Sequence, residues 1–478
     1  MYAHADLVTL TPELFVGGAA FALLMADLFI SDSRRGLSHF LAILILVAAA
    51  VLTARDMAHA QVFAFGNTFV RDFASDALKM AIYLTTAFSF VYAKPYLQDR
   101  DLFKGEYYSL TLFAVLGMML MVSAASLVTL YLGLELLALS SYGLVAIDRD
   151  NARGSEAAMK YFVLGALASG LLLYGMSMLY GASGSLQLEQ IYAAAGHGQN
   201  HALLMFGVVF MLVGIAFKFG AAPFHMWLPD VYQGAPTAVT LFIGSAPKLA
   251  AFGMAYRLLE SGVGPVDDQW RQMLAWLAAL SLILGNVVAL VQSNLKRMLA
   301  YSTISHVGFL FMGLANATAL GYSAAMFYAI SYALMSAAAF AAIILLSRRG
   351  FEAENIADFR GLWQRNPFHA LMVLFVMASL AGVPPFLGFF AKLKVIQAAL
   401  AGGMQWLAIL SVVCAVIGAF YYLRVIRAMF FEEPEGEGPR VHADSHLRAL
   451  FVVNALALLA FGLFVEPILA WCNLAFPG

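Results

Sequence analysis

Long apolar segments recur along the whole chain and are separated by short polar connections. A helix that spans a bilayer needs about 20 apolar residues, and about 14 segments approach or exceed that length. We therefore predict an all-α polytopic membrane protein with about 14 transmembrane helices. They lie near residues 11–30, 38–54, 76–93, 108–124, 126–147, 156–181, 203–233, 237–259, 270–291, 298–315, 319–347, 368–401, 405–430 and 447–472.

The seventh and twelfth segments are unusually long, and prolines interrupt both. Pro223 breaks the seventh within GAAPFHMWLP, and Pro384 and Pro385 break the twelfth within LAGVPPFLG. A proline inside a helix removes one amide donor and frees the carbonyl four residues back. At membrane depth a free carbonyl is tolerated only where protein or a wet cavity satisfies it, so the breaks indicate an ion path. The carbonyls concerned belong to Phe219, Leu380 and Ala381.

The two breaks also resemble each other in sequence, because Ala-Ala-Pro-Phe at 221–224 matches Val-Pro-Pro-Phe at 383–386. They lie five segments apart, and an odd offset reverses the direction across the membrane. This pattern is typical of inverted repeats with a functional path near their interface. We predict two five-helix repeats, spans 4–8 and 9–13. The predicted organisation is three transmembrane helices in 1–100, the first repeat in 101–262, the second in 263–431, and a cytoplasmic loop with the last helix in 432–478.

Lysine and arginine gather in every second connection, as in Arg34 and Arg35, Lys296 and Arg297, or Arg348 and Arg349. Short loops rich in these residues stay in the cytoplasm. With an even number of spans, both termini are expected on the outside.

Composition agrees with the membrane and excludes other classes of protein. The chain is 62% hydrophobic and 12% charged, whereas soluble domains carry about 25% charged residues. Its formal net charge of −1 and the absence of a basic tract exclude nucleic acid as a partner. Cys414 and Cys472 lack the spacing of a disulfide framework, a zinc site or an iron–sulfur site, and we interpret both as buried small hydrophobes.

Four ionisable side chains fall deep inside the predicted spans: Glu135, Lys218, Lys248 and Lys392. A charge at the bilayer centre costs about 2.5–3.5 kcal/mol on insertion scales, so each one needs a partner, water or a purpose. Burial disfavours the ammonium form of lysine, and a nearby carboxylate favours it. A lysine whose carboxylate approaches and withdraws can thus load and release a proton. We interpret the four as a proton relay, with structural ion pairs as the alternative.

Other polar positions near the spans are candidates for accessory roles. His225 follows the break in the seventh span and His306 lies in the tenth, and histidine titrates near neutral pH. Lys160 sits close to the cytoplasmic end of the sixth span, where it could instead snorkel to water. Lys394 is two residues from Lys392, so it faces elsewhere on the helix.

Five motifs carry a resemblance to a known family: YLGLELLALSSYGLVA, EAAMKYFVLGALASG, GIAFKFGAAPFHMWLPDVYQGAPT, QSNLKRMLAYSTISHVGF and AGVPPFLGFFAKLKVIQAA. With them the chain resembles the antiporter-like membrane subunits of proton-pumping NADH-quinone oxidoreductase (respiratory complex I). Among these it is most similar to the subunit N family, because it has Lys392 at the terminal site and stops soon after the last span.

The resemblance implies specific roles. Glu135 and Lys218 match the family's buried Glu–Lys pair, Lys248 the central lysine and Lys392 the lysine of the broken twelfth span, while Lys160, His225 and His306 match accessory positions. The resemblance further implies a multi-pass subunit of a bacterial inner membrane, surrounded by lipid and by sister antiporter-like subunits. No cofactor is expected in this chain, because flavin, iron–sulfur clusters and quinone belong to partner subunits.

Two other functions remain open from the residues alone. A subunit of a multi-subunit cation–proton antiporter would also suit inverted repeats and buried lysines, and so would a membrane subunit of a hydrogenase-type complex. A purely structural spacer is a further alternative, which the deep charges argue against.

Overall fold

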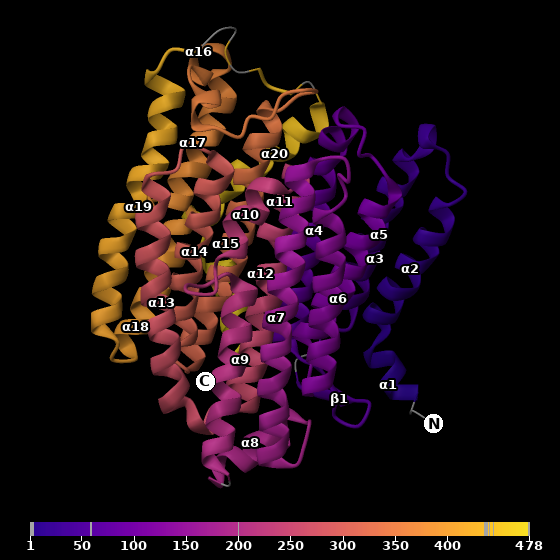
Figure 1. Cartoon of the computed structure of the whole chain (residues 1–478), viewed down its shortest axis with the longest axis vertical. Coiled ribbons are helices and arrows are strands. Elements are labelled where there is room, and N and C mark those ends of the chain that lie inside the picture. Colours follow the sequence, from indigo (N-terminus) through magenta and orange to yellow (C-terminus); the bar gives the residue numbers. More distant parts are fainter. Residues whose placement is uncertain are drawn as a thin grey trace.

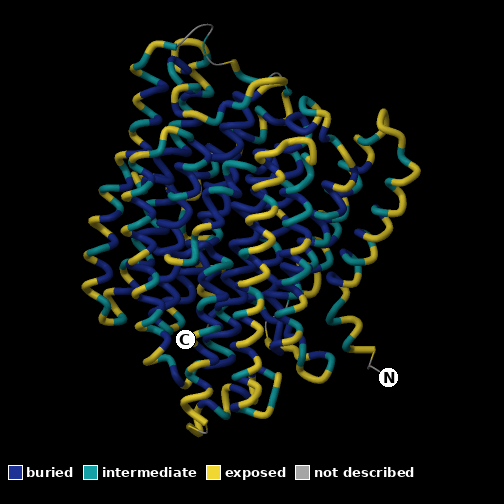
Figure 2. Tube along the Cα trace, in the orientation of Figure 1, coloured by how far each residue is buried: buried dark blue, intermediate teal, exposed yellow. Residues whose placement is uncertain are grey.

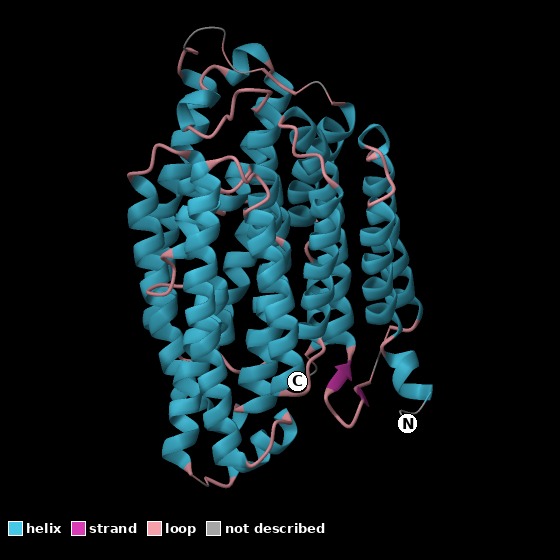
Figure 3. Ribbon diagram, turned by 45° about the vertical axis from the view of Figure 1, so that its right-hand side comes forward, coloured by secondary structure: helices cyan, strands magenta, loops and turns pink. Residues whose placement is uncertain are grey.

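The computed structural model describes residues 4–57, 60–198, 200–434, 438, 440–442 and 444–476. Helices dominate, and most run roughly along one common direction (Figure 1, Figure 3). Each predicted membrane segment contains a helix. Among the described residues, ten helices are long and apolar enough to cross a membrane. The all-α polytopic architecture is thus confirmed, while the number of spans stays a prediction.

In the N-terminal region α3 packs against the long helix α4, α2 packs against α3 and α5, and a small hairpin follows α3. Strands β1 and β2 pair antiparallel, with Val62 opposite Arg71, and the sequence pattern did not predict them. The elements of this region are α1 (His4–Thr9), α2 (Thr11–Asp27), the 3-10 turn η1 (Asp32–Arg34), α3 (Gly36–Arg55), β1 (Val62–Ala64), β2 (Phe69–Arg71) and α4 (Phe73–Asp99).

Buried ion pairs join this region together. The Nζ atom of Lys79 lies 2.7 Å from Oε1 of Glu13 on α2, and Nε of Arg71 lies 3.0 Å from Oδ2 of Asp76. All four side chains are buried. Because two acids face two bases, the group is neutral when every member is ionised.

The middle of the chain forms the first predicted repeat, together with an unpredicted short helix, α8. The eighth segment is also broken, since α11 ends at Gly244 and α12 begins at Ala246. Pro247 stands in the first turn of α12, where a missing amide donor costs nothing. The elements are α5 (Gly105–Val122), α6 (Leu127–Val145), α7 (Ala152–Ser183), α8 (Leu188–Gly196), α9 (His201–Phe219), α10 (Trp227–Gly234), α11 (Thr237–Gly244), α12 (Ala246–Tyr256) and the π-helical turn η2 (Arg257–Gly262).

The second half of the chain contains the second predicted repeat and the last membrane segment. Part of the predicted loop at 432–446 lies outside the described residues, and the last segment is divided between two helices. The elements are η3 (Gly264–Val266), α13 (Asp267–Leu290), α14 (Leu295–Leu314), α15 (Ala319–Leu346), η4 (Ile356–Phe359), α16 (Leu362–Arg365), α17 (Pro367–Ala381), α18 (Leu387–Ala401), α19 (Gln405–Phe431), α20 (Ser445–Leu463) and α21 (Glu466–Ala475).

Close helix pairs occur at equivalent places in the two predicted repeats. A Cβ atom added to Gly117 of α5 would lie 2.6 Å from the carbonyl oxygen of Gly133 on α6. One added to Gly285 of α13 would lie 2.5 Å from the amide nitrogen of Ser305 on α14. Only glycine permits such contact between backbones. The equivalence supports the repeats, whose residue boundaries stay a prediction.

The buried residues fill the centre of the helix bundle, and exposed residues lie on its outer helices and at its two ends (Figure 2). Both ends of the chain lie at the same end of the molecule, close to β1 and α8 (Figure 1). We call this the terminus end. The opposite end carries α16. An even number of crossings requires this arrangement, and the side of the membrane that the terminus end faces stays a prediction.

Candidate functional site

The first break is built around the carbonyl end of α9. Gly220 ends the helix with φ of +78°, a left-handed conformation that suits glycine. The indole nitrogen of Trp227 donates to the carbonyl oxygen of Phe217 at 2.9 Å. The amine of Lys248 donates to the carbonyl oxygen of Phe219 at 2.7 Å. A carbonyl expected to be free therefore accepts a bond from one of the predicted relay lysines.

Lys248 is 2% exposed and its Nζ atom lies 5.6 Å from the centroid of the Trp227 ring. It forms no ion pair within 4 Å to any residue that the structure describes. Its charge is instead stabilised by the carbonyl end of α9, where the helix dipole is negative. The break at Ser245 lies three residues before Lys248 and lets α12 begin beside α9, a feature that sequence reasoning missed.

The second break has the same design. Gly382 ends α17 with φ of +85°, and the amine of Lys392 donates to the carbonyl oxygens of Leu380 at 3.1 Å and Ala381 at 2.8 Å. Its Nζ atom lies 5.3 Å from the centroid of the Phe309 ring. Ala381 and Phe219 occupy matching positions in the two breaks, although one lysine comes from the same broken segment and the other from the following one.

Glu135 and Lys218 line a common small cavity, together with Ser169 and Trp227. Within the described residues the carboxylate and the amine form no direct ion pair. Glu135 instead accepts a hydrogen bond from the hydroxyl of Ser169. The cavity offers a volume of about 20 Å³ for the centre of a water molecule. This is enough for one water that bridges the carboxylate and the amine. Lys218 directly precedes Phe219, whose carbonyl oxygen accepts the hydrogen bond from Lys248.

His306 lies within a buried network of hydroxyl groups between α14, α15 and α19. Its Nδ1 atom is 2.7 Å from the hydroxyl of Tyr328, and its Nε2 atom is 3.1 Å from the hydroxyl of Tyr422. Tyr422 in turn shares a hydrogen bond with the hydroxyl of Ser302. The tyrosines were not predicted, because tyrosine is also a common core residue.

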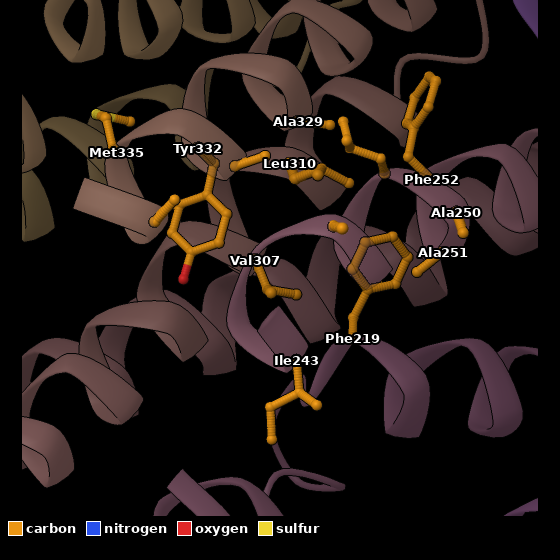
Figure 4. Packing of buried hydrophobic residues seen from close by; sticks show 14 of the residues in the cluster. Phe219, Ile243, Ala250, Ala251, Phe252, Val307, Leu310, Ala329, Tyr332 and Met335 are labelled. Atoms are coloured by element: carbon orange, nitrogen blue, oxygen red, sulfur yellow. The ribbon is translucent and has the colours of Figure 1, made fainter. Parts of the chain in front are cut away.

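Apolar packing separates this network from the first break. Figure 4 shows side chains from α9, α14 and α15 meeting in the core, with Val307 and Leu310 in the region between the rings of Phe219 and Tyr332. The hydroxyl of Tyr332 donates to Thr303 at 2.7 Å. A proton that moves between Lys248 and His306 therefore needs water or side-chain movement at this point.

The remaining predicted residues differ in their surroundings. His225 is half-buried in the loop of the first break, and its Nδ1 atom has no hydrogen-bond partner among the described residues. In the same loop Met226 is 71% exposed. Lys394 is also half-buried and makes no ion pair within the described part of the chain, so Lys392 is the lysine that reaches the second break.

Lys160 lies in a charged cluster at the end of the molecule opposite the termini. Its amine is 2.8 Å from Oδ2 of Asp230 and 2.9 Å from Oε1 of Glu156. Arg297 binds the other oxygen of Asp230 at 2.8 Å. The side chain of Lys160 is 43% exposed, so the snorkelling interpretation fits its position.

Besides Lys79 of the N-terminal ion pairs, sequence reasoning missed a second buried lysine, Lys296. Lys296 was counted within a connection, but its side chain is buried, and its amine donates to the carbonyl oxygen of Ala235 at 2.6 Å. Ala235 precedes Pro236 between α10 and α11. The available signal was that Lys296 stands at the start of an apolar helix. So close to a segment boundary, the sequence does not show whether a side chain is buried. Among the described residues no group of three His, Cys, Asp or Glu side chains could hold a metal ion.

Comparison with known proteins identifies the family of the chain. Residues 124–418, well over half of the chain, match the family model described as "NADH:quinone oxidoreductase/Mrp antiporter, TM". The match defines the class as antiporter-like membrane subunits. A solved structure of respiratory complex I from Thermus thermophilus with bound aureothin contains a chain with a TM-score of 0.82 and 32% identity, covering 96% of this chain and 98% of that one. The Mrp complex from Dietzia gives a TM-score of 0.85 at 23% identity, covering 98% and 97%, and supports the fold alone.

Curated relatives narrow the class. NADH-quinone oxidoreductase subunit N of Xanthomonas euvesicatoria is 58% identical over 99% of this chain and 97% of its own length. The protein of the same name from Thioalkalivibrio sulfidiphilus is 54% identical over 96% of both chains. The chain therefore belongs to the NADH-quinone oxidoreductase subunit N family, whose members are membrane subunits of a translocase complex. The predicted resemblance is confirmed, and the antiporter and hydrogenase-type alternatives are not supported.

Proposed function

We propose that this chain moves protons across the membrane through Glu135, Lys218, Lys248, His306 and Lys392, coupled to quinone reduction in partner subunits. The observation that carries the proposal is the pair of lysines bound to the carbonyl ends of the broken helices. Each amine is held by neutral oxygens and by no carboxylate of the described residues, so loss of its proton breaks no ion pair among them. The hydrogen bonds also fix where the proton is released.

The proposed route begins in the cavity shared by Glu135 and Lys218. The Glu135 carboxylate attracts a proton to Lys218, and like charges on Lys218 and Lys248 repel each other, so we expect the two amines to exchange protonation. From Lys248 the proton crosses the apolar region near Val307 after water enters it. The hydroxyl network around His306 then conducts it to Lys392, from which it leaves toward the terminus end. His225 and Lys160 remain accessory candidates.

The proposal includes the surroundings of the chain. The terminus end faces the outside of a bacterial inner membrane, because Lys and Arg gather in the connections of the opposite end. Sister antiporter-like subunits flank the chain in the membrane arm, and flavin, iron–sulfur clusters and quinone are bound by other subunits. The family name of the relatives supports the assignment of the chain to a complex with other subunits.

Substitution of Lys248 and Lys392 by methionine and by arginine tests the relay. Arginine retains donors for the helix carbonyls but stays charged in proteins, so a residue that only holds the break tolerates it better than methionine. We expect both substitutions to abolish proton pumping in vesicles that contain the assembled complex. Lys394→Met, in the same helix, is the matched control and should pump normally.

Two results would contradict the relay. Near-normal pumping by Lys248→Met in assembled complex would remove that residue from the path. Normal pumping by the arginine variants, with loss only for methionine, would make the lysines structural caps.

A further inference from the structure

A second polar site lies at the terminus end of the molecule, away from both breaks. A cavity of about 350 Å³ opens there between the start of α13 and the turn before α19. Its lining includes Asp268, Arg271 and Gln272 on α13, beside the rings of Trp276 and Trp406. Helix α13 therefore supplies an acid, a base and one aromatic ring, and Trp406 of α19 supplies a second ring.

The base is held in place by its neighbours. Nε of Arg271 donates to the carbonyl oxygen of Ala315 at 3.0 Å, and Nη1 lies 3.8 Å from Asp267 at the edge of ion-pair distance. The guanidinium group thus keeps donors for a further acceptor. Asp268 is exposed and has no ion-pair partner in the described residues. With two acids near one base, the site carries a formal charge of −1, so an anion without a compensating cation is disfavoured.

The two tryptophans mark the level of the lipid headgroups. Their ring centroids are 5.2 Å apart, and Trp276 is 64% exposed and Trp406 45% exposed. Tryptophan is enriched where membrane meets water, because its apolar ring carries one polar group. Asp268 lies about two helical turns nearer the start of α13 than Trp276, which places its carboxylate on the water side of the rings.

Below the tryptophans, two apolar rows continue along neighbouring helices. On α13 the row is Leu280, Ile283 and Val287, and on α19 it is Ile409, Val413 and Val416. These spacings keep each row on one helix face, and α13 packs against α19 through a hydrogen bond from Tyr421 to Asn286. A seam of this kind suits two hydrocarbon chains.

We propose that this seam binds a zwitterionic phospholipid at the terminus end. Its phosphate accepts hydrogen bonds from Arg271, its ammonium group contacts Asp268 beside the tryptophan rings, and its two acyl chains follow the apolar rows. One molecule of this class satisfies the acid, the base and the seam together. A helix of another subunit would cover the rows and leave the charged pair unmatched. This inference is independent of the proposed proton path.

Photolabelling of the intact complex in nanodiscs tests this site. Phosphatidylethanolamine and phosphatidylglycerol, each with a diazirine in one acyl chain, are compared at equal concentration, and adducts are mapped by mass spectrometry. We expect at least threefold more phosphatidylethanolamine adducts on 276–287 and 406–416. The double substitution Asp268→Asn with Arg271→Gln should reduce that preference to about one. Glu466→Gln, which removes one exposed acid at the same end of the molecule, should leave it unchanged.

Three outcomes would overturn the inference. Equal labelling by the two lipids in the unaltered complex would mean contact with bulk bilayer only. Absence of lipid adducts, with cross-links to another subunit in their place, would show that a protein helix covers the seam. A preference that survives the double substitution would show that the two charged residues do not select the lipid.

Discussion

Several single side chains in this molecule compensate a buried charge or a free backbone group. Lys248, Lys392 and Lys296 all donate to carbonyl oxygens left without a helical partner. Lysine suits this task because its long stem lets the amine reach a neighbouring element. Glu13 and Lys79 solve a different problem, since they pair with each other where α2 meets α4. Their neutrality indicates an anchor for the N-terminal helices and no role in proton transfer.

Substitution at this anchor should therefore show compensation. Glu13→Gln leaves the buried cluster with a net positive charge, and breaking a buried pair in this way costs about 3–5 kcal/mol. The double variant Glu13→Gln with Lys79→Met restores neutrality and should recover most of the loss. Thermal unfolding of the purified complex and the amount of subunit incorporated measure both effects.

The anchor interpretation also predicts activity. The double variant should pump protons at the rate of the unaltered complex once its assembly is matched. A double variant whose loss of stability equals the sum of the losses in Glu13→Gln and Lys79→Met alone would contradict this interpretation. An assembled double variant that cannot pump would contradict it as well.

Whole elements position these side chains through their ends. Both broken segments finish their first half in a glycine with left-handed backbone, and the next turns place a lysine or an indole on the last carbonyls. Position 382 requires glycine for two reasons. Its φ is positive, and an added Cβ atom would lie 2.9 Å from Cδ of Lys392. The conformation of this one residue thus sets the place of the amine.

Gly382→Ala should accordingly lower pumping more than it lowers assembly. Alanine in the left-handed region costs roughly 1–2 kcal/mol, and its methyl group displaces the Lys392 side chain from Ala381. Proton pumping and quinone reduction by the assembled complex are compared with those of Gly170→Ala, a position on α7 with open space around it. Equal activity of the two variants would show that the amine tolerates displacement.

Much of this level of structure could be predicted from sequence, and its failures have physical causes. Prolines fixed the positions of both breaks, and apolar length fixed the helices. The break at Ser245 was not predicted. Pro247 is compatible with a helix start, so nothing in the composition of that segment required an interruption. The links from Lys248 to Phe219 and from His306 to Tyr422 join residues 29 and 116 positions apart. One sequence carries no signal for contacts of that kind.

At the scale of the whole molecule, the helices form one bundle with both termini at one end (Figure 1). The basic connections of the sequence gather at the other end, near α16 and the Lys160 cluster. The distribution of charge favours the proposed orientation in the membrane, and the position of both termini at one end agrees with the predicted even number of crossings.

Single-cysteine labelling tests this orientation. The native cysteines, Cys414 and Cys472, are buried, so background reaction with an impermeant maleimide is expected to be low. Glu189→Cys and Glu466→Cys, both exposed near the terminus end, should react in intact spheroplasts. Arg365→Cys, exposed on α16 at the opposite end, should react only after the membrane is opened. The reverse pattern would invert the proposed direction of transport.

The exposed loop of the first break has a consequence for electrical insulation. Met226 projects from the flank of the bundle, and Glu135 and Lys218 nearby are only half-buried. In a single chain without its partner subunits, lipid tails would contact the charged cavity on that flank, and water could enter the cavity. The cavity of Glu135 and Lys218 is thus shielded on that side only when another apolar surface covers it, so electrical insulation is a property of the assembled membrane arm.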